Sequence, residues 1–194
     1  QGQIVVIVHQ DGSEEIVKKS MAQDGRISFL LEESASVKLV DYTNPFGDIS
    51  QDAWYADAVG FVAGREVFLG VDEGRFAPDE TLSRSMLATV LYRLEEPDFS
   101  STENVFVDTR ADAWYTQAVM WGVEEGTVLG YADGRFGPED PITREQLALM
   151  LYRYAETTGL STSGRDTLRS FSDSSRISAW ARDAMAWAVD SGIL

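Results

Sequence analysis

Two arginines 60 residues apart, Arg84 and Arg144, carry the pattern most suggestive of chemistry. Each is predicted to lie on the first turn of a helix, where a cation is unfavourable because helix N-termini prefer negative charge. An arginine beside unpaired backbone N–H groups is a prepared receptor for a carboxylate or phosphate. An internal ion pair with an acid such as Asp48 or Asp108 is the alternative, and the residues alone do not separate the two hypotheses.

The helix starts are predicted from capping residues directly before the arginines. Thr143 is a candidate N-cap, and Gln146 three positions later completes a capping box. Ser83 is the equivalent cap, but Met86 cannot return the hydrogen bond. We therefore expect the first cap to be weaker by up to about 1 kcal/mol.

Both arginines belong to an internal repeat. Residues 46–93 align with residues 106–153 without a gap, and 20 of the 48 aligned positions are identical. A third copy begins at Phe171, places Trp180 one position late, and runs to residue 194. A repeat of this length cannot bury its apolar face alone, so the copies are expected to share a core.

A glycine-rich loop recurs before each arginine, at residues 69–84 and 129–144. Gly70 and Gly130 follow the first helix, where a positive φ or a close backbone approach is wanted. Phe76 and Phe136 are predicted to anchor the loops to the core.

Apolar residues at helical spacing flank each loop. Each copy is therefore predicted to be helix, loop, helix. We interpret the aromatic residues of the first helices as core residues rather than ligand platforms. The first-helix stripes are Trp54, Ala58, Phe61 and Val62, then Trp114, Ala118, Trp121 and Val123, then Trp180, Ala184, Trp187 and Ala188; the second-helix stripes are Leu87, Val90, Leu91 and Leu94, then Leu147, Met150, Leu151 and Tyr154.

Residues 3–42 are predicted to form β structure. β-Branched runs alternate with Asp-Gly turn signals, which gives four expected strands: 3–9, 14–20, 26–31 and 36–42. The fold class is thus mainly α with a small N-terminal β-meander. His9, the sole histidine, is expected at a strand end in a surface or packing role.

Composition excludes several classes of function. The net charge is −16, which disfavours nucleic-acid partners because phosphate binding needs a basic surface. The absence of cysteine removes disulfides and thiolate metal sites. The same absence of cysteine fits an exported bacterial protein. No apolar run is long enough to span a membrane and no signal peptide is visible, and a chain that starts at Gln1 inside a predicted strand is expected to be a fragment.

These motifs resemble the S-layer homology (SLH) domain family. That family combines a Phe-x-Asp start, a tryptophan on the first helix, a Gly-Tyr-x-Asp-Gly-x-Phe-x-Pro loop and a Thr-Arg-Ala-Glu second-helix start. The second copy matches closely, whereas the first has Ser-Arg-Ser-Met. The matching segments are Phe106–Asp108, Trp114, Gly130–Pro138 and Ile142–Gln146, and in the first copy Phe46–Asp48, Trp54, Gly70–Pro78 and Leu82–Met86.

The resemblance implies a non-catalytic cell-wall anchor. Family members cluster three repeats about a pseudo-threefold axis and bind secondary cell-wall polysaccharide, often through a pyruvate ketal whose carboxylate is read by the motif arginine. It implies an extracellular location at the wall or S-layer, an anionic polysaccharide partner, and neither cofactor nor metal. The expected glycan-binding residues are Arg84, Arg144, Trp54, Trp114, Gly70, Gly130, Asp48, Asp108 and Asp173.

The expected organisation is a β module at 1–43 and an SLH region at 44–194. Its repeats are 44–97, 104–160 and a truncated 169–194, and the truncation is expected to open an apolar face to self-association.

Two alternatives to a glycan anchor remain. An enzyme is disfavoured by the single histidine and absent cysteine. A calcium-stabilised structural or protein–protein module would use the acids of the two loops, although their spacing is not that of an EF-hand. Those acids are Asp72, Glu73, Asp79, Glu80, Asp133, Glu139 and Asp140.

Overall fold

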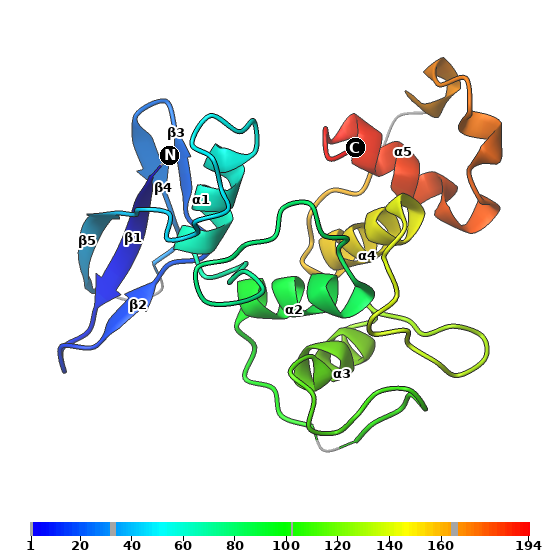
Figure 1. Cartoon of the computed structure of the whole chain (residues 1–194), viewed down its shortest axis with the longest axis horizontal. Coiled ribbons are helices and arrows are strands. Elements are labelled where there is room, and N and C mark those ends of the chain that lie inside the picture. Colours follow the sequence, from blue (N-terminus) through cyan, green and yellow to red (C-terminus); the bar gives the residue numbers. More distant parts are fainter. Residues whose placement is uncertain (1, 32–33, 102, 164–166) are drawn as a thin grey trace. The chain divides into compact units, whose positions relative to one another are not determined.

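The structure is a computed structural model that describes residues 2–31, 34–101, 103–163 and 167–194. The chain divides into two compact units, Gln1–Glu80 and Thr81–Leu194 (Figure 1). The division between a β module and an SLH region at residues 43 and 44 stays a prediction.

The first unit begins with five short strands. β1 (Gln3–Val8) lies between β2 (Glu14–Ile16) and β5 (Ser36–Asp41), and both pairings are antiparallel. β3 (Met21–Gln23) and β4 (Arg26–Ser28) form a separate hairpin. The predicted meander is therefore wrong. The β-branched run of β1 takes the central position and pairs with β5 although β2, β3 and β4 intervene along the chain, so strand pairing does not follow sequence order.

α1 (Ala56–Gly64) belongs to the same unit as the strands. Arg65, which is 1% exposed, donates from Nε to the Ser20 carbonyl at 2.9 Å and from Nη2 to the Gln3 carbonyl at 3.4 Å. A Cβ on Gly64 would lie 2.9 Å from the Tyr42 ring, so the helix end fits closely against the strand region. The β segment and the first repeat helix thus share one packed unit.

The second unit contains α2 (Arg84–Glu95), α3 (Thr116–Glu124), α4 (Arg144–Thr157) and α5 (Arg182–Asp190). Short 3-10 turns, η1 (Thr167–Ser170), η2 (Ser174–Arg176) and η3 (Ala179–Ala181), precede α5. Helix–loop–helix copies are present as predicted, but the helices pair across copies: α2 packs on α3, and α4 on α5. The second helix of one copy therefore packs on the first helix of the next.

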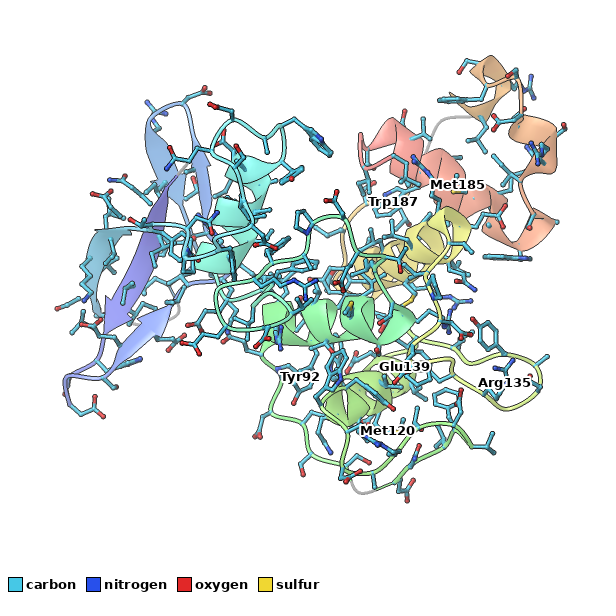
Figure 2. All side chains as sticks on the ribbon, viewed as in Figure 1. Tyr92, Met120, Arg135, Glu139, Met185 and Trp187 are labelled. Atoms are coloured by element: carbon cyan, nitrogen blue, oxygen red, sulfur yellow. The ribbon has the colours of Figure 1, made fainter. Side chains whose placement is uncertain are left out.

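An aromatic contact recurs at both helix pairs. The Tyr92 and Trp121 ring centroids lie 5.8 Å apart, and those of Tyr152 and Trp187 lie 5.7 Å apart, edge to face in each case. Figure 2 labels one ring of each pair, Tyr92 and Trp187. The Trp187 indole also donates to the Ser161 carbonyl. These pairs bury large apolar areas, with the further gain of favourable ring geometry.

The helix caps match the sequence prediction. Thr143 and Gln146 form the full capping box at α4, whereas Ser83 Oγ accepts from the Met86 N–H without a returned bond. Tyr154 of α4 also hydrogen-bonds Glu95, the last residue of α2. Burial and this carboxylate raise the pKa of Tyr154 above its ordinary value. No helix in the part of the chain that the structure describes has the length and apolar character to cross a membrane.

Candidate functional site

The aspartate of each Phe-x-Asp motif holds the following glycine-rich loop. Asp48 accepts the Phe76 N–H at 2.9 Å and the Ala77 N–H at 2.7 Å. These hydrogen bonds hold the pKa of Asp48 below its ordinary value. Each carboxylate oxygen serves one N–H, so the loop backbone is fixed at two adjacent residues.

Asp108 repeats this arrangement in the second copy. It accepts the Phe136 N–H at 2.7 Å and the Gly137 N–H at 2.8 Å. The two loops therefore share a clamp that the sequence did not reveal, since backbone N–H groups carry no residue signature.

Gly70 and Gly130 allow the loop to pass close to the motif phenylalanine. A Cβ on Gly70 would lie 2.8 Å from the Phe46 ring and 2.5 Å from the Arg75 carbonyl. A Cβ on Gly130 would lie 2.2 Å from the Phe106 ring. Only Gly70 has a positive φ, so close approach is what both positions share.

Arg84 is buried inside the second loop. Its side chain is 5% exposed, and it donates from Nε to the Phe136 carbonyl at 2.8 Å and from Nη2 to the Leu129 carbonyl at 2.7 Å. The guanidinium lies over the Tyr131 ring, 4.7 Å from its centroid. Burial lowers the pKa of Arg84, and the charges of Tyr131, Asp140 and Asp108 oppose that shift.

The hydrogen bonds of Arg84 replace the internal ion pair considered from the sequence, while its role as a ligand receptor stays a prediction. Its described partners are backbone carbonyls, and it forms no ion pair with an acid within the described residues. Asp140 and Asp108 act on it electrostatically without a direct bond. A carbonyl receptor cannot be read from the sequence because every residue carries one.

Arg144 is in the opposite situation. It is exposed on the first turn of α4, and its guanidinium forms no hydrogen bond or ion pair with any described residue. The neighbouring Glu145 accepts the Ser178 N–H at 2.8 Å. Arg144 is therefore an exposed cation on the first turn of a helix whose N-terminus is capped by Thr143. Arg84 and Arg144 occupy equivalent positions in two copies of the repeat, but the guanidinium of Arg84 is buried and that of Arg144 is exposed.

The tryptophans predicted at the start of the first-helix stripes are not core residues. Trp54, Trp114 and Trp180 are 92%, 61% and 54% exposed. Each precedes its α-helix, since α1, α3 and α5 begin two residues later, so the helical period does not carry these rings inward. Trp54 and Trp114 stand edge-on to the following tyrosine, at 5.5 Å from Tyr55 and 5.3 Å from Tyr115.

The third copy places its aspartate differently. Asp173 precedes η2 and forms no side-chain cap there. The end of the predicted first-helix stripe in this copy is buried as expected, because Trp187 and Ala188 of α5 pack against α4.

In each loop an arginine forms an ion pair with an acidic residue of the same loop. Arg75 pairs with Glu80, and Arg135 pairs with Asp133 at 2.9 Å. Arg135 also lies 5.4 Å from the Tyr131 ring centroid, and Figure 2 labels it on the loop between α3 and α4. Within the described ranges no three acids or histidines gather as a metal site.

Comparison with protein families finds one match. The model of the S-layer homology domain matches residues 45–85, 105–148 and 170–194, one segment within each of the three copies.

Three relatives illustrate where such segments occur. An amylopullulanase from Thermoanaerobacterium thermosulfurigenes is 28% identical over 89% of this chain, which corresponds to 9% of the enzyme. An endoglucanase from Bacillus sp. (strain KSM-635) is 30% identical over 73% of the chain and 15% of its own length. A surface-layer 125 kDa protein from Lysinibacillus sphaericus is 31% identical over 78% of the chain and 12% of its own length.

Proposed function

We propose that this chain, which belongs to the S-layer homology domain family, anchors a larger protein to the bacterial wall by binding an anionic secondary cell-wall polysaccharide. The family is one of cell-surface anchoring modules, and its members are extracellular and wall-associated. The matched relatives include two enzymes and a surface-layer protein, and the chain spans only 9–15% of their lengths. The cargo that it anchors is therefore part of the proposal.

The accessibility of Arg144 is the observation that carries the proposal. Its guanidinium is exposed on the N-terminus of α4 and is free of described partners. A small carboxylate such as a pyruvate ketal would receive a charge-assisted bond from this group and further stabilisation from the helix dipole. Local recognition of this kind works against the repulsion expected between an acidic chain and an anionic polymer.

The remaining predicted residues have two proposed roles. Trp54 and Trp114 are exposed, which supports a role as flat faces for sugar rings. Gly70, Gly130, Asp48 and Asp108 would shape the glycan grooves by holding the loops. Arg84 would reach a ligand through Nη1 or the second N–H of Nη2, because Nε and one N–H of Nη2 are used by the second loop.

Asp173 and the third copy complete the proposal. We place Asp173 in the glycan site on repeat equivalence, and we propose a pseudo-threefold cluster of the three copies. Self-association through residues 169–194 is supported by the exposure of Phe171, Trp180 and Ile193.

Calorimetric titration with purified wall polysaccharide tests the function. We expect saturable binding that is lost after mild acid removal of pyruvate, and a loss of about 2–3 kcal/mol in Arg144→Gln. Arg110→Gln is the control, since Arg110 is another exposed arginine of the same unit. Binding that survives both depyruvylation and Arg144→Gln would show that the glycan is read elsewhere.

A further inference from the structure

The second loop, residues 129–140, brings three polar side chains together around Gly137. A Cβ on Gly137 would lie 2.4 Å from the Asp140 carboxylate and 2.7 Å from the Tyr131 ring, so both groups lie against the glycine. The Arg84 guanidinium lies over the same ring, 4.7 Å from its centroid. A carboxylate, a phenol and a guanidinium therefore converge within the second unit.

Each of these groups keeps hydrogen-bonding capacity that the protein does not use. Neither the Asp140 carboxylate nor the Tyr131 hydroxyl forms a hydrogen bond or ion pair with any residue that the structure describes. Arg84 Nη1 has no such partner either. Among the described residues no side-chain nitrogen or oxygen is both buried and without a partner, so Nη1 reaches solvent although Arg84 is only 5% exposed.

Asp140 is held in place by its own backbone. Its N–H donates to the Gly137 carbonyl at 3.1 Å, and its carbonyl accepts the Arg84 N–H at 3.1 Å. The carboxylate is therefore positioned by a fixed main chain rather than by a salt bridge. Such positioning is what a binding group needs, because little ordering remains to be done when the ligand arrives.

The first loop does not build this cluster. Val71 stands at the position of Tyr131, so the phenol is missing. Glu80 stands at the position of Asp140, and it pairs with Arg75. Comparison of the two loops thus shows that the unpaired carboxylate beside an aromatic ring belongs to the second loop and is not required by the shared loop backbone.

The local charge favours an uncharged ligand over an anion. Asp133 bonds to Arg135, and the charges of Asp140 and Asp108 reach it as well. Asp140 and Asp108 also act on Arg84. Three carboxylates against two guanidiniums leave no excess of positive charge for an anion. Carboxylates accept hydrogen bonds from hydroxyl groups and guanidiniums donate to them, so the cluster suits the adjacent hydroxyls of a neutral sugar ring.

We infer that the second loop carries a subsite for a neutral hexopyranose unit of the wall polysaccharide, in which Asp140 accepts from adjacent ring hydroxyls while Arg84 Nη1 and the Tyr131 hydroxyl bond to the same sugar. The inference rests on the proposed function, because it adds a second contact to the same polymer. It differs from the contact proposed at Arg144 in that it needs no pyruvate ketal. Alone it should have about millimolar affinity, which NMR detects and calorimetric titration does not resolve.

An NMR titration of the full chain tests the subsite. The ¹⁵N-labelled protein is titrated with depyruvylated wall polysaccharide, and we expect saturable shifts in the amide signals of residues 131–140. Asp140→Asn should weaken this binding by about tenfold, because it replaces a charged acceptor by a neutral amide. Glu139→Gln, at the neighbouring exposed acid of the loop (Figure 2), is the matched control and should bind as the unchanged chain does.

A second variant keeps the test independent of misfolding. Tyr131→Phe retains the ring under Arg84 and removes only the hydroxyl, so it should weaken binding by a few-fold while the rest of the spectrum is unchanged.

Two results would overturn the subsite and leave the proposed function standing. In one, intact polysaccharide shifts the signals of residues 143–146 while the depyruvylated polymer leaves residues 131–140 unshifted. In the other, Asp140→Asn binds the depyruvylated polymer as tightly as Glu139→Gln does. Absence of binding by either form of the polymer would overturn the proposed function and the subsite together.

Discussion

Asp108 shows how a single carboxylate fixes a binding loop. Both of its oxygens accept loop N–H groups, so Asp108→Asn would place an amide NH₂ against one of those donors. We expect a loss of about 1–3 kcal/mol in the free energy of unfolding, measured with urea. Asp112→Asn, at an exposed position of the same copy, should have little effect, and an equal loss there would contradict the role of the clamp.

Asp48 should make the first loop sensitive to acid. Because its pKa in the folded chain lies below the ordinary value of 3.8, ionised Asp48 stabilises the folded state above that pH. The contribution is lost as the pH falls through the folded pKa. An NMR titration of the carboxyl group should give a midpoint below 3.8, and Asp48→Asn should remove this part of the pH dependence. A midpoint at or above 3.8 would show that the two N–H bonds are not made in solution.

At the scale of the helices, the two equivalent arginines should respond differently to the same substitution. Arg84→Gln removes the donor that serves one buried and one partly buried carbonyl of the second loop, and we expect a loss of about 2–4 kcal/mol. Arg144→Gln removes an exposed group and should change stability by less than about 0.5 kcal/mol. Urea unfolding of the two variants makes the comparison, and equal losses would show that Arg144 is also structural.

The pairing of α4 with α5 gives a second prediction. Trp187→Ala removes the ring that packs on Tyr152, with an expected cost of about 3–5 kcal/mol. Hydrogen exchange should show lost protection in α5, while α2 and α3 keep theirs. Trp180→Ala, at an exposed ring, is the control. Uniform loss of protection in all four helices would mean that they unfold as one.

Helix identity could be predicted from the sequence, but helix pairing could not. The stripe that contains Leu87 and Leu91 indicates which face of α2 is apolar, and the Thr143 box indicates where α4 begins. Neither indicates that α2 packs against α3 of the next copy. The prediction that Trp54 and Trp114 are core residues was wrong for a related reason. Each lies two residues before its helix begins, where the helical spacing no longer determines which side chains are buried.

At the scale of the whole chain, the 60-residue period and the compact units do not coincide. The first unit ends at Glu80, inside the first repeat, because α1 is tied through Arg65 to the strand region. The corresponding position in the second copy is Glu125, so the difference was visible in the sequence. The structural role of Arg65 could not be predicted, because it donates to backbone carbonyls, which every residue type carries.

Net charge gives the last prediction, which concerns the glycan. With a net charge of −16, the chain should be repelled at long range by an anionic polysaccharide, while the contact at Arg144 acts at short range. Raising the salt concentration from 0.01 to 0.15 M shortens the Debye length from about 30 to about 8 Å, so it should screen the repulsion more than the contact. The association rate, measured by surface-bound polysaccharide, should rise roughly tenfold. A steady fall in rate with salt would instead mean that a local basic surface, rather than one arginine, draws the polymer in.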